Sequence, residues 1–407
     1  MIIVNLVATA RRLTVHQATR RLGVKPETLY AYVSRGVLRS QRAADGRSST
    51  FDADEVEALA RRGRPRRSTR TGALDIAIAT SLTSIERDRL RFRSHDAIDL
   101  AQHHTFEEVA HLLWTGELTR AAAPWPAVSA PRRRLPASAN VFDRLTMALV
   151  SAAASDPARR SVDIVTTGRR AIAIELDALP LAGEPRVPQL RLPGREPVRH
   201  TIAGRLWSRL APGRPPSGAI RALNAALVVL ADHELAASTL AVRVAASTRA
   251  DPYAALVAGI ATVSGSHHGS ASFFTRRTID RAAATSSDAA LTEVHARTGA
   301  YPGFGHSVYE RSDPRAAVVL DLVRAAWPSS KRLAQVDALV AAAQRRAGLW
   351  PNIDLALAAL GHAAGRNAHA GDAIFAIART AGWLAHAAEE YTEPVLRFRP
   401  RADYVEP

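Results

Sequence analysis

The stretch YPGFGHSVYERSDPR, residues 301–315, places two glycines, a histidine, an aspartate and two arginines in a chain otherwise rich in alanine and leucine. Glycine lets the backbone approach a ligand closely, and histidine and arginine side chains bind carbonyl and carboxylate oxygens. Three more polar clusters interrupt the apolar background: LADHELAAST (230–239), GSHHGSAS (265–272) and PNID (351–354). These four clusters are therefore the candidates for a functional site.

Around the four clusters, apolar residues recur at i, i+3, i+4 and i+7 from Ala73 onward, which is the spacing of a helix with a buried face. Clear examples are FEEVAHLLWTGEL, VFDRLTMALVSAAA and AIFAIARTAGWLAHAAEEY. Segments that alternate apolar and polar residues over the length of a strand are few, so the sequence predicts an all-α fold. Two stretches rich in proline and glycine, residues 121–139 and 179–197, are predicted to be loops.

Residues 1–65 are predicted to form a separate small domain. Thr14 and Gln17 have the spacing of a capping box at the start of a helix, and Pro26 suits the first turn of a second helix. A basic segment with a glycine turn could form a wing before a third helix that begins near Asp52. This layout resembles the MerR-like and excisionase-like winged helix-turn-helix domains, which bind DNA.

The resemblance implies that the second helix would enter the major groove, while arginines would contact phosphates. The residues concerned would be Thr28, Tyr30, Tyr32, Arg35, Arg39, Arg42 and Arg47. Residues 1–70 contain fifteen Lys and Arg against six Asp and Glu, a net charge of +9 in a chain of net charge +16, and this favours an acidic partner. The alternative is a small helical domain whose arginine face makes only protein contacts.

Residues 66–72 contain no apolar position and are predicted to be a basic linker to a second domain, residues 73–407. The apolar runs fall short of the roughly 18 residues needed to span a bilayer, and the N-terminus lacks the features of an export signal. The chain has no cysteine, which excludes disulfides and thiolate chemistry. We therefore expect a soluble, cytoplasmic protein.

The polar clusters do not match several common kinds of site. The 14 histidines show no HExxH or other compact ligand spacing, so no metal is expected, and HHTFEEVAH (103–111) is better explained as a helix start. Paired carboxylates of the glycosidase type, a GxSxG elbow and a phosphate-binding glycine loop are also missing. The remaining histidines, arginines and single aspartate suit enolisation of a weak carbon acid beside a small polyanionic substrate.

In their order and sequence contexts, the four clusters resemble the citrate synthase family, and the resemblance extends from about residue 72 to the C-terminus. It implies an all-helical homodimer with a large domain and a small one, the small one inserted at about residues 272–372. It also implies an acyltransferase that condenses acetyl-CoA with oxaloacetate and water to give citrate and CoA, with no cofactor beyond the acyl-CoA substrate. Oxaloacetate would close the cleft between the domains and exclude water.

The resemblance also assigns residues to roles. His268 would stabilise the enol of the acyl-CoA, Asp354 would remove the proton, and His306 would polarise the oxaloacetate carbonyl. Oxaloacetate would be held by a further set of side chains: His233, Arg315, Arg379 and Arg399. Of these, Arg399 would reach across the dimer interface into the partner's site.

The sequence departs from the family pattern at Ser270, Ser272, Ser307 and Glu310. Glu310 stands where many members have a basic residue near the CoA phosphates, and an acid there would repel a polyphosphate unless Arg311 compensates. Three functions stay open: a citrate synthase, a 2-methylcitrate synthase that uses propionyl-CoA, and a DNA-binding regulator that senses oxaloacetate or an acyl-CoA.

Overall fold

The computed structural model divides the chain into two compact units, Met1–Ala79 and Thr80–Pro407. The residues that the structure describes are 12–22, 24–34, 37–42, 48–61, 77–119, 125, 135–161, 163–184, 187–265, 269, 271–366 and 368–399. The predicted linker, residues 66–72, lies outside the described residues.

The described residues of the first unit form three helices and a three-stranded antiparallel sheet of order β1-β3-β2. Its elements are β1 (Arg12–Thr14), α1 (Val15–Leu22), α2 (Pro26–Ser34), β2 (Ser40–Arg42), β3 (Ser49–Asp52) and α3 (Ala53–Arg61). The Thr14 amide donates to Gln17 Oε1 at 2.9 Å and the Gln17 amide donates to Thr14 Oγ1 at 3.3 Å, which confirms the predicted capping box. The predicted helix start at Pro26 is confirmed as well.

A small apolar core holds the first unit together. It consists of Ala18, Leu29, Leu38, Phe51 and Val56, with Tyr32 and other partly buried side chains packed against it. At the third helix, Asp52 Oδ1 accepts the amides of Asp54 and Glu55, whereas the Glu55 carboxylate binds Arg39. Tyr32, which packs against this core, and Arg39, which forms this ion pair, both belong to the residues predicted to contact DNA.

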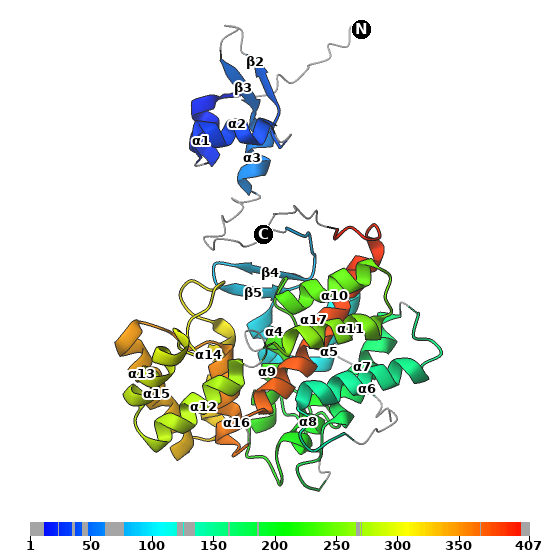
Figure 1. Cartoon of the computed structure of the whole chain (residues 1–407), viewed down its shortest axis with the longest axis vertical. Coiled ribbons are helices and arrows are strands. Elements are labelled where there is room, and N and C mark those ends of the chain that lie inside the picture. Colours follow the sequence, from blue (N-terminus) through cyan, green and yellow to red (C-terminus); the bar gives the residue numbers. More distant parts are fainter. Residues whose placement is uncertain are drawn as a thin grey trace, which may run out of the picture. The chain divides into compact units, whose positions relative to one another are not determined.

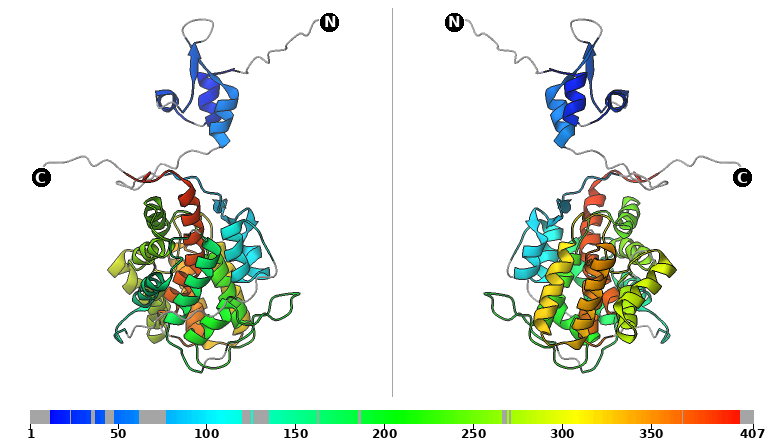
Figure 2. Two further views of the ribbon diagram at one scale, coloured as in Figure 1. Left: turned by 90° about the vertical axis from the view of Figure 1, so that its right-hand side faces the viewer. Right: turned by 90° about the vertical axis from the view of Figure 1, so that its left-hand side faces the viewer.

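The second unit is predominantly helical (Figures 1 and 2). Its elements are β4 (Thr83–Glu86), β5 (Arg89–Phe92), β6 (His95–Asp96), α4 (Ala97–His103), α5 (Phe106–Thr115), α6 (Val141–Ser155), α7 (Ile164–Ala178), α8 (Ile202–Leu210), α9 (Ala219–Leu230), α10 (Ala237–Ser247), α11 (Pro252–Val263), α12 (Ala271–Ala284), α13 (Ser287–Thr298), α14 (Pro314–Ala326), α15 (Lys331–Ala347), α16 (Ile353–Ala363) and α17 (Ala370–Thr392). In the part of the chain that the structure describes, none of the helices is long and apolar enough to cross a membrane.

The prediction of a predominantly helical second domain is confirmed, and this unit contains in addition one small sheet that was not predicted. Strands β4, β5 and β6 form an antiparallel sheet of that order, and they are only two to four residues long. Strands of two to four residues complete at most two cycles of apolar and polar alternation, as β5 (RLRF) does, and this is too short a pattern to distinguish a strand from a loop or a helix end. The predicted start of a helix after HHT is confirmed: Thr105 and Glu108 form a capping box at α5.

Helix α17 lies at the centre of the second unit and contacts α5, α7, α9, α10, α11 and α16 (Figure 1). Most of its side chains are buried, including the polar Arg379, Thr380 and His386. Gly382 permits the close approach to the end of α9, since a Cβ there would lie 2.4 Å from the Ala231 carbonyl oxygen. The segment predicted as a small subdomain contains α13 to α16, most of α12 and the start of α17, and α12 packs against α13, α15 and α16.

Glu175 of α7 is fully buried, and its carboxyl group accepts a hydrogen bond of 2.9 Å from Thr380 Oγ1. Burial raises the pKa of Glu175 from 4.5 to about 8. Between these values the unfolded chain loses the proton that the folded chain keeps, so stability falls as the pH rises from about 4.5 to 8. The expected loss at pH 8 is of the order of 4 kcal/mol.

Replacing Glu175 by glutamine should therefore raise the thermal midpoint at pH 8 and leave it nearly unchanged near pH 4.5, because the amide keeps an acceptor oxygen but cannot ionise. Glu117→Gln is the matched control, since Glu117 is exposed. Scanning calorimetry at the two pH values measures the difference. A lower midpoint for Glu175→Gln than for the wild type at pH 8 would show that the ionised carboxylate stabilises the fold.

Candidate active site

The segments around His306 and Asp354 are held together by backbone pairing. Phe304 and Pro351 form an antiparallel bridge, and the Gly305 amide donates to the Trp350 carbonyl at 2.9 Å. The side chain of Asn352, the N-cap of α16, donates to the Gly305 carbonyl at 2.9 Å. Two of the four sequence clusters, 301–315 and 351–354, are therefore paired with each other in the fold.

Glycine is required at Gly303, whose φ is +86° and where a Cβ would lie 2.5 Å from Thr275 Cγ2. The Gly303 carbonyl accepts the Asn352 amide at 2.9 Å. This close packing against α12 fixes the turn that presents His306, as the glycine pattern of the sequence indicates.

Asp354 lies in the first turn of α16, where its amide donates to Asn352 Oδ1 at 3.0 Å. Burial raises the pKa of Asp354 to about 6, and Asp313 and Asp372 add to the rise while Arg315 opposes it. A carboxylate with a pKa close to neutrality is ionised at pH 7 and still basic enough to accept a proton from carbon. Asp354 therefore has the properties of a general base.

Arg315 and Asp313 form a buried ion pair at the start of α14. Arg315 Nε donates to Asp313 Oδ1 at 2.9 Å and Arg315 Nη2 donates to Asp313 Oδ2 at 2.8 Å, a bidentate arrangement. The Ile353 amide donates to the same carboxylate at 2.9 Å, which ties the pair to the start of α16. Burial alone would raise the pKa of Asp313, but the Arg315 guanidinium holds it below its usual value.

Two hydrogen-bond donors converge beside this ion pair. The Val308 amide donates to His306 Nδ1 at 3.0 Å, so a neutral His306 carries its proton on Nε2. That nitrogen lies 3.2 Å from Arg315 Nη2, which is also a donor. Burial, followed by the charge of Arg315, lowers the pKa of His306 to about 4, so the ring is neutral at pH 7. The arrangement suits an anionic or carbonyl oxygen that lies to one side of the two nitrogens and accepts a hydrogen bond from each.

His233, which follows α9, completes this group. Its Nε2 lies 3.1 Å from the Tyr309 hydroxyl, and its ring centroid is 5.3 Å from that of His306. Burial, with the charges of Arg315 and Arg379, lowers the pKa of His233 well below 6.5. The guanidinium carbon of Arg315 lies 5.1 Å from the centroid of the Tyr309 ring. Tyr309 was not predicted, although it lies three residues after His306 in the same cluster.

Arg379 is buried in α17, and its Nε donates to the Leu230 carbonyl at 2.9 Å. Burial lowers the pKa of Arg379 to about 10, so the side chain stays a cation at pH 7. The buried Asp232 carboxylate, which accepts from Thr83 Oγ1 and lies 3.3 Å from His386 Nε2, partly balances this charge. The structure thus brings five predicted residues together: His233, His306, Arg315, Asp354 and Arg379.

Of the predicted site residues within the described part of the chain, Arg399 is not part of this group. His268 lies outside the described residues, together with Ser270. Arg399 is exposed in the segment after α17, which Arg397 anchors through its ion pair with Glu390 at 2.6 Å.

Two of the positions that depart from the expected pattern, Ser272 and Glu310, have hydrogen-bond partners in the fold. Asp88, in the turn between β4 and β5, accepts the amides of Glu310 and Arg311 at 2.7 and 3.0 Å. Ser272 Oγ donates to Asp372 Oδ1 at 3.1 Å, and His369 Nδ1 lies 2.9 Å from Asp372 Oδ2. Sequence reasoning missed both aspartates, because no spacing in the sequence links either of them to the four clusters.

Among the predicted DNA-contacting residues, Thr28 and Tyr30 are exposed on α2, whereas Tyr32 is partly buried against the core of the first unit. Arg39 forms an ion pair with Glu55 at 2.8 Å, and Arg42 lies on β2. Arg35 and Arg47 lie outside the described residues. Within the described part of the chain, no group of three His, Asp or Glu side chains could hold a metal ion.

Comparison with known proteins gives a consistent picture. A family model described as "Citrate synthase, C-terminal domain" matches residues 74–401. The chain is 28% identical over 282 residues to citrate synthase 2 of Bacillus subtilis, covering 61% of this chain and 72% of that protein. It is 29% identical over 266 residues to the 2-methylcitrate synthase of Shewanella oneidensis, covering 59% of this chain and 68% of that protein.

Solved structures show the same fold. The citrate synthase of Thermotoga maritima superposes with a TM-score of 0.65 at 24% identity, covering 81% of this chain and 93% of that chain. The citrate synthase of Thermoplasma acidophilum, in a ternary complex with carboxymethyl coenzyme A and oxaloacetate, gives a TM-score of 0.67 at 23% identity and covers 81% and 94% of the two chains.

Proposed function

We propose that this chain, which belongs to the citrate synthase family, condenses an acyl-CoA with oxaloacetate and water to give a tricarboxylate and CoA. The observation that carries the proposal is the convergence of His306 Nε2 and Arg315 Nη2, 3.2 Å apart, beside a carboxylate whose pKa is about 6. Two donors and a base are the groups needed to activate a ketone and to form an enol.

In the proposed mechanism, Arg315 and Arg379 bind the carboxylates of oxaloacetate, and His233 contributes a further hydrogen bond. The Nε2 proton of His306 polarises the ketone oxygen. Asp354 removes a proton from the carbon next to the thioester, and the resulting enol, stabilised by His268, attacks the ketone carbon. Water then cleaves the thioester, which releases CoA and adds the third carboxylate.

The acyl donor is proposed to be acetyl-CoA or propionyl-CoA, since the chain is about equally similar to the citrate synthase and 2-methylcitrate synthase relatives. The test is to incubate the chain with oxaloacetate and each acyl-CoA and to identify the product by mass spectrometry. Citrate from acetyl-CoA or 2-methylcitrate from propionyl-CoA is expected, and the ratio of the two kcat/KM values assigns the donor. If neither product forms, the proposed activity is wrong.

We further propose that the chain forms a homodimer, with Arg399 entering the partner's site. Exposed apolar side chains support an interface on the second unit: Met147 and Val150 of α6 are 37% and 47% exposed, and Val244 of α10 is 40% exposed. Helices α6 and α10 both pack against α11. Light scattering should give twice the chain mass of 43.7 kDa, and a monomer at micromolar concentration would contradict the proposal.

A second candidate function is DNA binding by the first unit. The helices α1 and α2, the neighbouring strands β2 and β3, and the exposed Tyr30 on α2 support it, together with the net charge of +9 in residues 1–70. Fluorescence anisotropy with duplex DNA should show binding that weakens steeply between 50 and 200 mM salt. Absence of binding even at low salt would instead favour protein contacts by this unit.

A further inference from the structure

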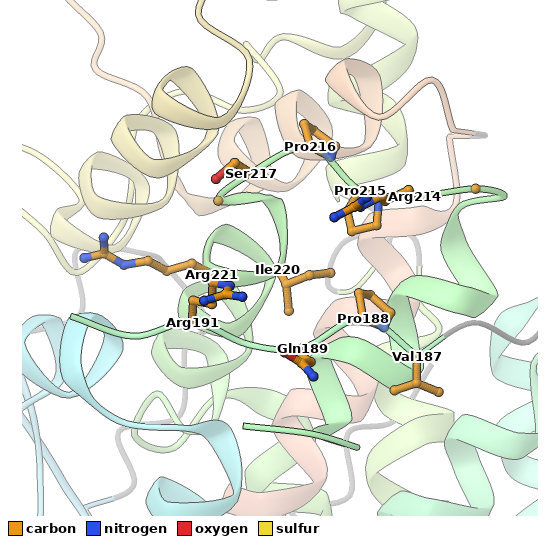
Figure 3. A pocket seen from close by; sticks show the side chains of 12 residues that line it. Val187, Pro188, Gln189, Arg191, Arg214, Pro215, Pro216, Ser217, Ile220 and Arg221 are labelled. Carbon is orange, nitrogen blue, oxygen red and sulfur yellow. The ribbon is translucent and has the colours of Figure 1, made fainter. Parts of the chain in front are cut away.

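Two charged features of the second unit lie outside the proposed mechanism. One is a cavity of about 710 Å³ at the start of α9, with three arginines among its lining residues (Figure 3). The Ala219 amide at this helix start already donates to the Pro216 carbonyl at 3.2 Å, and none of the residues that line the cavity belongs to the candidate active site. The other feature is the buried carboxylate of Asp372, which lies close to the proposed base.

Asp372 is in the first turn of α17, at a point where three helices meet. Helix α17 packs against α12 and α16, and α12 also packs against α16. The backbone at Gly371 comes so close to these helices that a Cβ there would overlap with Ser272 Oγ and lie 3.3 Å from Leu357 Cβ. Leu357 follows Asp354 by three residues and therefore shares a face of α16 with it. The start of α17 thus packs on the face of α16 that carries Asp354.

The carboxylate of Asp372 has a partner on each of its two oxygens. Ser272 Oγ, in the first turn of α12, donates to Oδ1 at 3.1 Å, and His369 Nδ1 lies 2.9 Å from Oδ2. Asp372 and Ser272 are each only 2% exposed. The His369 side chain is about half exposed, and its ring stacks on that of Phe273 with the centroids 4.5 Å apart. Asp372 therefore joins the start of α12 to the start of α17 through a buried hydrogen bond.

The same turn of α12 ends the cluster GSHHGSAS, which contains His268. Gly269, the next residue in the chain, donates its amide to the Val263 carbonyl at the end of α11, at 2.9 Å. Ser272 is held by Asp372. The described residues that follow His268 are thus anchored to α11 and to α17, and a shift of Ser272 relative to α17 would displace the end of this cluster.

Asp372 also acts on Asp354 through its charge. Burial is the main cause of the raised pKa of Asp354, and the negative charges of Asp313 and Asp372 raise it further, against the opposing effect of Arg315. Burial raises the pKa of Asp372 as well, while His369 of α17 and Ser272 of α12 oppose this rise by stabilising the ionised form. A negative charge close to a carboxylate makes that carboxylate a stronger base.

We propose that Asp372 is a positioning residue of the catalytic centre, which fixes the first turn of α12 and strengthens Asp354 as a base. Asp372 needs no contact with either substrate for this role, because it acts through Ser272 and Asp354. The kinetic consequences rest on the proposed condensing activity. The alternative is that Asp372 serves only the start of α17, since an acidic side chain in the first turn of a helix interacts favourably with the helix dipole.

Two variants separate the two parts of the proposal. Asp372→Asn keeps an acceptor oxygen for Ser272 but loses the charge, whereas Ser272→Ala keeps the charge but loses the hydrogen bond. Asp372→Asn should move the midpoint of the acid limb of the kcat/KM profile down by about half a pH unit or more, because Asp354 then loses its proton at a lower pH. Steady-state release of CoA between pH 5 and 8 measures the profile.

Ser272→Ala should lower kcat by about tenfold above this midpoint, because the reacting groups are then less well placed. The midpoint itself should move by less than in Asp372→Asn, since the carboxylate is kept. The KM for oxaloacetate should stay within about twofold of the wild-type value in both variants, because neither change removes one of its proposed ligands. Asp321→Asn, which changes an exposed carboxylate of α14, is the control and should alter none of these values.

Carbon-13 NMR of protein labelled at the aspartate carboxyl carbons measures the change at Asp354 without turnover. The Asp354 signal is the one that Asp354→Asn removes, and its titration midpoint should be lower in Asp372→Asn than in the wild type. A chain that releases no CoA would contradict the proposed condensing activity, and the NMR midpoint would still decide whether Asp372 acts on Asp354.

An unchanged Asp354 midpoint in Asp372→Asn would overturn the electrostatic part of the proposal. A wild-type kcat in Ser272→Ala would overturn the part that concerns the position of α12. If thermal melting shows that Asp372→Asn is less stable than the wild type while the midpoint stays the same and Ser272→Ala keeps its kcat, Asp372 serves only the start of α17 and the whole proposal is wrong.

Discussion

Replacement of Asp354 by asparagine is expected to lower kcat by about 10²–10⁴-fold, the usual contribution of a positioned general base. Asparagine fills the same space but cannot accept the proton from the acyl carbon. The KM for oxaloacetate should change little, because the proposed carboxylate ligands are Arg315 and Arg379. Steady-state release of CoA at saturating acyl-CoA measures both parameters.

Asp321→Asn is the control for this experiment, since Asp321 is an exposed carboxylate on α14. It should retain wild-type turnover. If Asp354→Asn kept more than a tenth of the wild-type kcat, another group would have to be the base.

The pKa of Asp354 also determines how kcat/KM is expected to depend on pH. Since the pKa of Asp354 is raised to about 6, kcat/KM should fall tenfold for each unit of pH below that value as the base becomes protonated. His306, with a pKa of about 4, stays neutral over this range and should add no second step. A profile that is flat between pH 5 and 7 would contradict the assignment.

Replacement of Arg315 by glutamine is expected to have the second large effect, because two functions are lost together. Loss of a charged donor to the substrate should lower kcat/KM for oxaloacetate by roughly 10²–10³-fold. Loss of the bidentate partner also leaves the carboxylate of Asp313 buried without a counter-charge, which should cost roughly 3–5 kcal/mol of stability.

The double variant Arg315→Gln/Asp313→Asn separates the two effects. Removing both charges should restore much of the thermal stability, while the kcat/KM for oxaloacetate should stay low. Recovery of turnover together with stability would mean that the ion pair serves only the fold. Thermal melting and steady-state kinetics on the same preparations provide both readings.

The helices of the second unit and several residues of the candidate site could be predicted from the sequence. The side chains that contact those site residues could not. Helix starts at Thr14, Pro26 and Thr105 were visible because capping residues and proline act locally, within one turn. The pairing of the His306 and Asp354 segments depends on backbone hydrogen bonds between residues about 45 positions apart. Only the resemblance to a known family linked those segments beforehand.

Three groups around the site escaped prediction for a common physical reason. Tyr309, Asp88 and Asp372 gain their roles from contacts that the fold creates, namely to His233, to the amide of Glu310 and to Ser272. Their residue types are ordinary, and their positions follow no helical or ligand spacing.

The central claim is that His306, Arg315 and Asp354 form the catalytic centre of an oxaloacetate-dependent condensing enzyme. The most direct test is release of free CoA from acetyl-CoA and from propionyl-CoA by the wild-type chain, with and without oxaloacetate, beside Asp354→Asn. The account predicts release that requires oxaloacetate and drops at least 100-fold in the variant. Wild-type protein that releases no CoA from either donor at saturating oxaloacetate, or that releases it equally without oxaloacetate, would contradict the account.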